Sequence, residues 1–276
     1  MKMVYKNILM ALSLLCLTAT GLSAIEIKEL PSKLTLSKAL YNHCLELTQS
    51  QQLLKLYIQS ALHLRYQSPQ KTLEDAIPKY DKRLKTLQHF FNTQFTQEED
   101  KKRFAEGVEI WENEVKPLLL SPPNKRNTVT LKKLFSTMYT LLKSTKVLAK
   151  KLTKKGFSAV KMTGGICYGS QDMATLYLMK KALALEVPDY KKKMQKKMAS
   201  FEKKLAALKA LKINTPEINT ALDKAKKAYH YFTFMYDSEK SVIPSLMSKK
   251  ADEIFHKIES VKKLYGKILK NTPAHQ

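Results

Sequence analysis

Apolar residues recur every three or four positions along most of the chain, which is the spacing of one face of an α-helix. The first such stripe consists of Leu36, Leu40, Cys44, Leu47, Gln51, Leu54, Ile58 and Leu62. A single polar amide, Gln51, interrupts its middle. The segments are rich in Leu, Lys, Ala, Glu and Gln, all strong helix formers, and the whole chain has only seven glycines. The pattern predicts an all-α protein.

Cap and turn signals divide the chain into eight predicted helices. Ser68-Pro69 and Thr215-Pro216 each combine an N-cap residue with a proline in the first helical turn. Proline and glycine clusters mark several of the breaks, because helix continuation is costly there. The predicted helices span residues 33–65, 69–94, 97–119, 128–154, 158–186, 188–211, 216–237 and 245–270.

The sequence also repeats itself at a nearly constant distance. Ser50-Gln51 recurs as Ser170-Gln171, and Leu56-Tyr57 recurs as Leu176-Tyr177, both displaced by 120 residues. A later phrase that begins at Tyr80 recurs from Phe201, displaced by 121 residues. Such a displacement indicates an internal duplication.

Each repeat is large enough to bury a core of its own as a four-helix bundle. We therefore predict two tandem four-helix bundles, residues 25–155 and residues 156–276. The sequence leaves two arrangements open. The two first helices pack against each other as an internal pseudo-dimer, or a long kinked connection holds the bundles end to end.

The first 24 residues have the pattern of a secretory signal peptide. Lys2 and Lys6 precede an apolar run of about 15 residues that ends in Ser23-Ala24. This run is shorter than the roughly 20 apolar residues that a membrane-spanning helix needs. We expect cleavage near Ala24 and a periplasmic or secreted protein that does not span the membrane.

The chain is strongly basic, with a formal net charge of +25. Lysine supplies nearly all of the positive charge, and arginine occurs only at Arg65, Arg83, Arg103 and Arg126. This balance favours either a solvated lysine-rich exterior or attraction to anionic surfaces such as membrane headgroups. Nucleic acid is not an expected partner, because its binding sites favour arginine forks and stacking aromatics.

Gln51 and Gln171 are the most distinctive local feature, because each interrupts an apolar stripe. A buried amide without partners costs about 1 to 3 kcal/mol. One interpretation is that each amide fixes the register of neighbouring helices. The other is a polar pocket floor between helices, for which the candidate ligand-binding residues are Ser50, Gln51, Gln52, Tyr57, Ser170, Gln171, Asp172 and Tyr177.

The motif small-Gln-x-x-Ala-x-Leu-Tyr-Leu, followed by Phe-Glu-x-x-Leu-x-x-Leu, resembles the PilJ-type sensory domain of type IV pilus methyl-accepting chemotaxis transducers. That domain is related to the sensor modules of nitrate/nitrite histidine kinases. The matching residues are Ser170, Gln171, Met173, Ala174, Leu176, Tyr177 and Leu178 in the second repeat and Ser50, Gln51, Lys55, Leu56 and Tyr57 in the first. The resemblance implies a periplasmic helical bundle that binds a small ligand or a protein partner.

The family motif carries arginines around its Ser-Gln pair, whereas this chain has Gln52 and Asp172 directly after the glutamines. Without a guanidinium fork, a small planar anion lacks its usual bidentate donor. We therefore do not expect a nitrate-type site. The chain also ends after its last predicted helix without a signalling region, so we expect no signalling across a membrane by this chain alone.

Other chemistry is sparse. Cys44 and Cys167 form either a disulfide or two free thiols, since export permits a bridge but the spacing does not identify one. We expect no metal site, no cofactor and no enzymatic activity, because the sequence shows no paired ligands, phosphate loop or nucleophile motif. Two functions remain open: a sensory-type protein that binds a ligand or partner, and a basic surface-interaction protein that binds anionic envelope components.

Overall fold

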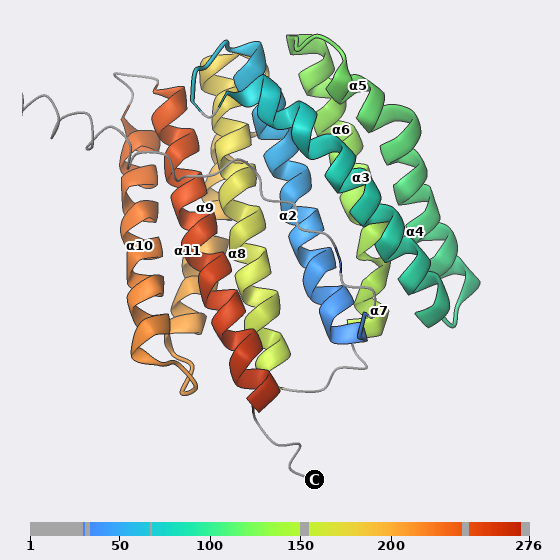
Figure 1. The fold of residues 1–276 in the computed structure, drawn as a ribbon. Helices are drawn as coiled ribbons and strands as arrows, with labels where there is room; N and C mark the ends of the chain where they lie inside the picture. Colours follow the sequence, from blue (N-terminus) through green and yellow to red (C-terminus); the bar gives the residue numbers. More distant parts are fainter. Residues whose placement is uncertain (1–29, 31–33, 67, 150–154, 239–242, 272–276) are drawn as a thin grey trace, which may run out of the picture.

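A computed structural model describes residues 30, 34–66, 68–149, 155–238 and 243–271. These residues form helices and no strand, so the predicted all-α fold is confirmed (Figure 1). The predicted signal peptide, residues 1–24, lies outside the described residues.

The described helices match the eight predicted segments closely. The first four segments are α2 (Leu36–Ala61), α3 (Pro69–Gln94), the continuous run α4 (Glu98–Ile110), η1 (Trp111–Val115) and α5 (Lys116–Leu120), and the run α6 (Lys125–Leu142), η2 (Lys143–Thr145) and α7 (Lys146–Ala149). The last four are α8 (Lys155–Tyr177) with η3 (Leu178–Ala182), α9 (Tyr190–Lys209), α10 (Pro216–Asp237) and α11 (Pro244–Asn271).

The cap signals are confirmed in part. The hydroxyl of Thr215 accepts a hydrogen bond from the backbone of Ile218 at 3.3 Å, as an N-cap should. Ser68 is the N-cap of α3 but makes no capping bond with its side chain, because its backbone is in the left-handed region. In that conformation the hydroxyl does not face the first turn of the helix.

The helices pack in two sets of four that meet along their first helices. α2, α3, α4 with α5, and α6 form one set, and α8, α9, α10 and α11 form the other. α2 lies beside α8 in the middle of the molecule, as Figure 1 shows. Of the two arrangements that the sequence left open, the structure therefore has the side-by-side one. That the two sets descend from a duplication stays a prediction.

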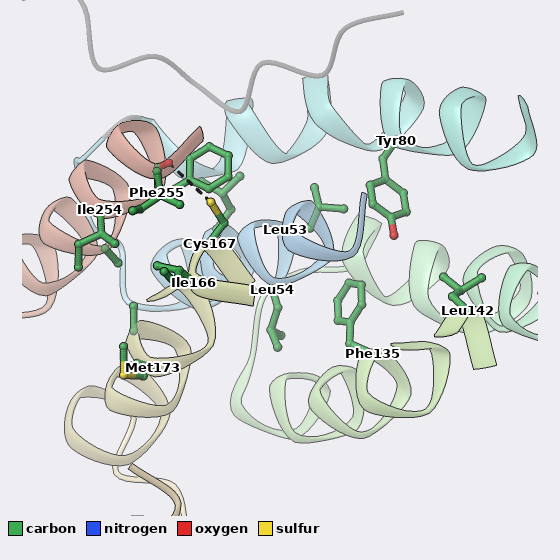
Figure 2. Close-up of a cluster of buried hydrophobic side chains, with 14 of the residues drawn as sticks. Leu53, Leu54, Tyr80, Phe135, Leu142, Ile166, Cys167, Met173, Ile254 and Phe255 are labelled. Carbon is green, nitrogen blue, oxygen red and sulfur yellow. Dashed lines mark hydrogen bonds between the residues drawn. The ribbon is translucent and has the colours of Figure 1, made fainter. Parts of the chain in front are cut away.

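The apolar core does not stop at the boundary between the sets. Leu53, Leu54 and Phe135 of the first set belong to the same cluster of buried side chains as Met173 and Ile254 of the second (Figure 2). Because burial of apolar surface drives folding, this continuity couples the two sets energetically.

The backbone repeats an unusual conformation at the corresponding place in each set. Among the described residues, positive φ at non-glycine positions occurs at His63 (51°), Ser68 (43°), Ala184 (52°) and Asp189 (54°). These residues form two pairs displaced by 121 residues, and each pair lies between the first and second helices of its set. Positive φ is uncommon for such side chains, so the recurrence is a specific structural similarity.

The π-helix η3 accounts for the change of displacement from 120 to 121. The displacement is 120 along α2 and α8, and it is 121 at His63 and Ala184, just beyond η3. A π-turn holds one residue more than an α-helical turn of the same length. We infer that η3 accommodates one residue that the first set lacks.

Candidate functional site

The two stripe-interrupting glutamines make equivalent contacts in the two sets. The Gln171 amide Nε2 donates to the carbonyl of Ala251 at 3.1 Å and to Oδ1 of Asp252 at 3.2 Å. Gln51 Oε1 accepts from the ammonium of Lys132 at 3.3 Å. Lys132 and Asp252 are themselves 120 positions apart. Each glutamine thus ties the first helix of its set to the fourth, which favours the register interpretation.

The same two residues of the fourth helices form ion pairs across the α2–α8 boundary. Lys132 on α6 pairs with Asp172 on α8, and Asp252 on α11 pairs with Lys55 on α2. Both members of the Lys55–Asp252 pair are buried. A buried pair costs free energy through desolvation, and the loss of one partner leaves an uncompensated charge. These bridges therefore fix how the two sets fit together.

Asp172 is the centre of a small charged cluster. Burial tends to raise the pKa of this carboxyl group, but the ammonium groups of Lys132 and Lys197 together lower the pKa below its ordinary value. Asp172 is consequently a carboxylate at neutral pH, with a cation on each side. The prediction had placed Asp172 in a ligand site without identifying these partners.

The predicted hydroxyl groups are used for internal bonds. Ser50 donates to the carbonyl of Leu47 at 2.8 Å, and Ser170 donates to that of Cys167 at 2.9 Å. Both hydroxyl groups are thus satisfied by backbone carbonyl groups of their own helices.

The predicted tyrosines anchor the first helix of each set to the loop that precedes the fourth. Tyr57 donates to the carbonyl of Pro122 at 3.2 Å, and Tyr177 shares a hydrogen bond with the backbone of Ile243. All eight candidate ligand-binding residues are buried: Ser50, Gln51, Gln52, Tyr57, Ser170, Gln171, Asp172 and Tyr177. Asp172 and Tyr177 also line hollows that are open at the surface, and these two hollows are different.

A hollow of about 340 Å³ lies between α8 and α9, and lysines line it. Lys193, Lys196, Lys197 and Lys204 project from α9, while Gly165 and Gly169 on α8 form part of the opposite wall. A Cβ atom at Gly165 would lie 3.2 Å from Nζ of Lys204. The absence of a side chain at this position lets the lysine lie close to α8. We call this hollow the lysine groove.

The lysine groove carries uncompensated positive charge. Asp172 is the acid in its lining, and the charge of Asp172 is already met by Lys132 and Lys197. Lys193, Lys196 and Lys204 have no acidic partner among the described residues. Burial and the neighbouring Lys197 lower the pKa of Lys204. An anion in the groove would relieve this repulsion.

Sequence reasoning did not identify Lys132, Lys197 and Asp252, and it named Lys55 only as part of the family motif. One signal was present: residues 132–135 read Lys-Lys-Leu-Phe, and residues 252–255 read Asp-Glu-Ile-Phe, displaced by 120. The apolar pair Leu134-Phe135 recurs as Ile254-Phe255, whereas the basic pair Lys132-Lys133 is replaced by the acidic pair Asp252-Glu253. The lysines of the groove gave no such signal, because lysines at this spacing are found on any solvent-exposed helix face.

Cys44 and Cys167 are free thiols in the structure, so the disulfide that the sequence left open is not formed. Burial raises the pKa of both thiols. The described residues contain no group of three His, Cys, Asp or Glu side chains that could hold a metal ion. None of the described helices combines the length and apolar composition of a membrane span.

Comparison with models of protein families, with curated proteins and with solved structures gives no match to this chain. The resemblance to the PilJ-type sensory domain therefore stays a prediction.

Proposed function

We propose that this chain is a binding protein, not an enzyme, and that it takes an anionic ligand in the lysine groove. The observation that carries this proposal is that Lys193, Lys196 and Lys204 line one hollow without acidic partners among the described residues. Lys204 is partly buried and is repelled by the neighbouring Lys197, which raises the free energy of the empty site. An anion with several charges offsets this cost.

Lysine selects a different anion from arginine. Its ammonium group is a compact point charge, whereas arginine offers a planar fork that fits one carboxylate or phosphate group. The lysine groove therefore suits a ligand with several phosphate or carboxylate groups better than a small planar anion such as nitrate. Such ligands include anionic components of the cell envelope. The chain would reach them after the export that the predicted signal peptide implies.

We further infer that the two sets of helices arose by duplication and act as an internal pseudo-dimer. The support is the recurrence of the Gln51 and Gln171 contacts, the Tyr57 and Tyr177 contacts, and the paired positive-φ residues at displacements of 120 or 121. The predicted resemblance to a PilJ-type sensory domain agrees with a binding role. In that role α2 and α8 would transmit ligand binding to a protein partner.

Isothermal titration of residues 25–276 with inorganic tripolyphosphate tests the groove. The triple variant Lys193→Gln/Lys196→Gln/Lys204→Gln is expected to weaken binding at least tenfold, and 0.5 M salt is expected to weaken binding of the unchanged chain as well, because it screens the exposed lysines. The control variant replaces Lys224, Lys226 and Lys227 on the exposed side of α10 by glutamine, which removes the same charge. Equal losses in the two variants would show that only overall charge matters and would refute the proposal.

A further inference from the structure

One end of the molecule, which we call the loop end, gathers exposed apolar side chains. At this end α2 connects to α3, α5 to α6, η3 to α9 and α10 to α11, and Figure 1 shows these helix ends together at the top. Leu120, Phe234 and Ile243 lie here, with exposed fractions of 57%, 73% and 42%. Tyr231, one turn before Phe234 on α10, is half exposed. Exposed groups of large apolar side chains commonly mark an interaction surface.

An apolar hollow of about 220 Å³ opens at the loop end, beside these residues. Phe234, Ile243 and Leu246 line it together with Tyr177. Lys250 lies at its edge, with Nζ 5.1 Å from the centre of the Tyr231 ring and 2.8 Å from a carboxylate oxygen of Glu253. The hollow thus offers apolar walls with a cation beside them.

Basic residues are frequent at the same helix ends. The exposed ones are Arg65, Lys125, Arg126, Lys180, Lys181, Lys191, Lys192 and Lys249. Exposed acids at the same helix ends are fewer: Glu74, Glu186, Asp189 and Asp237. The loop end therefore combines apolar projections with an excess of positive charge.

We propose that the loop end docks on a lipid bilayer that contains anionic headgroups. Apolar side chains gain free energy when they enter the boundary between headgroups and acyl chains, and lysines gain when they lie near anionic lipids. Long lysine side chains also reach the headgroups while their stems follow the apolar surface. Charge complementarity selects an anionic bilayer as the occupant, because an apolar protein surface would leave the surrounding lysines without partners.

Docking at the loop end is independent of the lysine groove. The apolar residues of the loop end lie on α5, on α10, and at or just before the start of α11, and none of them lines the groove. The two proposals can therefore fail separately. The groove variants test the first with a soluble anion, and substitutions at the loop end test the second with vesicles.

Vesicle co-sedimentation of residues 25–276, which contain every described helix, provides the test. The vesicles consist of phosphatidylcholine alone or of phosphatidylcholine with 30% phosphatidylglycerol. We expect binding to the anionic vesicles and a loss of about tenfold in the double variant Phe234→Ser/Ile243→Ser. The control is Ile213→Ser/Val147→Ser, since these residues are 42% and 41% exposed. Ile213 lies between α9 and α10 and Val147 lies on α7, at the other end of the helices (Figure 1).

Equal binding by the two double variants, or equal binding to both kinds of vesicle, would overturn the proposal. A second measurement does not depend on affinity. Trp111 is fully buried, so a tryptophan introduced by Phe234→Trp supplies the solvent-sensitive part of the emission. Anionic vesicles should shift this emission to shorter wavelength, and an unchanged spectrum with bound protein would also overturn the proposal.

Discussion

Gly164 on α8 lies against Cys44 on α2, the residue 120 positions earlier in the chain. A Cβ atom at Gly164 would lie 3.4 Å from the Cβ of Cys44. Equivalent residues of two helices meet in this way when the helices run parallel and in register about an axis between them. The same relationship places Gln51 and Asp172 on one ammonium group, that of Lys132.

Asp252→Asn should destabilise the fold strongly. The substitution leaves the ammonium of Lys55 buried without a counter-charge, which typically costs about 3 to 5 kcal/mol. Urea unfolding followed by circular dichroism measures the loss. Asp223→Asn is the matched control, because its pair with Lys209 is exposed and should change stability by less than about 1 kcal/mol. Similar effects for the two variants would contradict the structural role of Asp252.

Gln59→Met should stabilise the protein. Gln59 is fully buried, and neither its amide nitrogen nor its amide oxygen has a hydrogen-bond partner within the part of the chain that the structure describes. The equivalent position 120 residues later is Met179, which is also buried. Removal of the unpaired amide is expected to add about 1 to 3 kcal/mol to the free energy of unfolding. If the variant instead loses stability in urea unfolding, an internal water molecule or another bound molecule forms hydrogen bonds with the amide of Gln59, and the prediction is wrong.

Gly107→Ala and Gly169→Ala should have opposite effects. A Cβ atom at Gly107 would lie 2.9 Å from Leu142 Cδ2, so α4 and α6 must separate or Leu142 must move. Such overpacking costs about 1 to 3 kcal/mol. At Gly169, inside α8, no atom lies within 4 Å of the added Cβ, and alanine should gain up to about 1 kcal/mol. Thermal unfolding of both variants measures the difference, and shifts of the same sign would refute this account.

His43 should make stability fall as the pH falls. Burial lowers the pKa of its imidazole from 6.5 to about 4, although its hydrogen bond to the carbonyl of Leu142 opposes the shift. Between pH 6.5 and 4 the unfolded chain binds a proton that the folded chain does not. The free energy of unfolding should therefore decrease over this window, by up to about 3 kcal/mol from this group.

Urea unfolding of His43→Gln and of the unchanged chain, each at pH 7 and pH 4.5, isolates this contribution. The variant should lose less stability on acidification than the unchanged chain does. His89→Gln, at an exposed position, is the control and should keep the full response. An identical response in His43→Gln would show that His43 is not the group responsible.

Local signals were sufficient to predict the helices. Apolar spacing and prolines such as Pro69 and Pro216 act within a few residues, and they placed all eight helical segments within a few residues of their observed ends. The π-helices η1 and η3 were not predicted, because a shift of one residue in the apolar pattern does not show whether the extra residue lies in a π-turn or in a loop. The left-handed conformation of His63, which ends α2 sooner than expected, also gave no sequence signal.

The candidate site was predicted less well, because it depends on contacts between distant segments. Gln51 and Gln171 stood out in the sequence as polar interruptions of apolar stripes, but the side chains that they contact lie 81 residues further along the chain. Lysines 193, 196 and 204 resemble the other lysines of a basic chain until α9 is placed beside the glycines of α8. Periodicity indicates which residues face inward, but not which helix they meet.

The bridges across the α2–α8 boundary have a consequence for the ancestry of the proposed duplication. Two copies of the first half, paired in the same way, would bring Lys132 towards a second Lys55, and two copies of the second half would bring Asp252 towards a second Asp172. Identical subunits must repeat every substitution on both sides of their axis, whereas a fused chain is free of this constraint. Because the charges at positions 132 and 252 are opposite, each half pairs favourably with the other half and unfavourably with a second copy of itself.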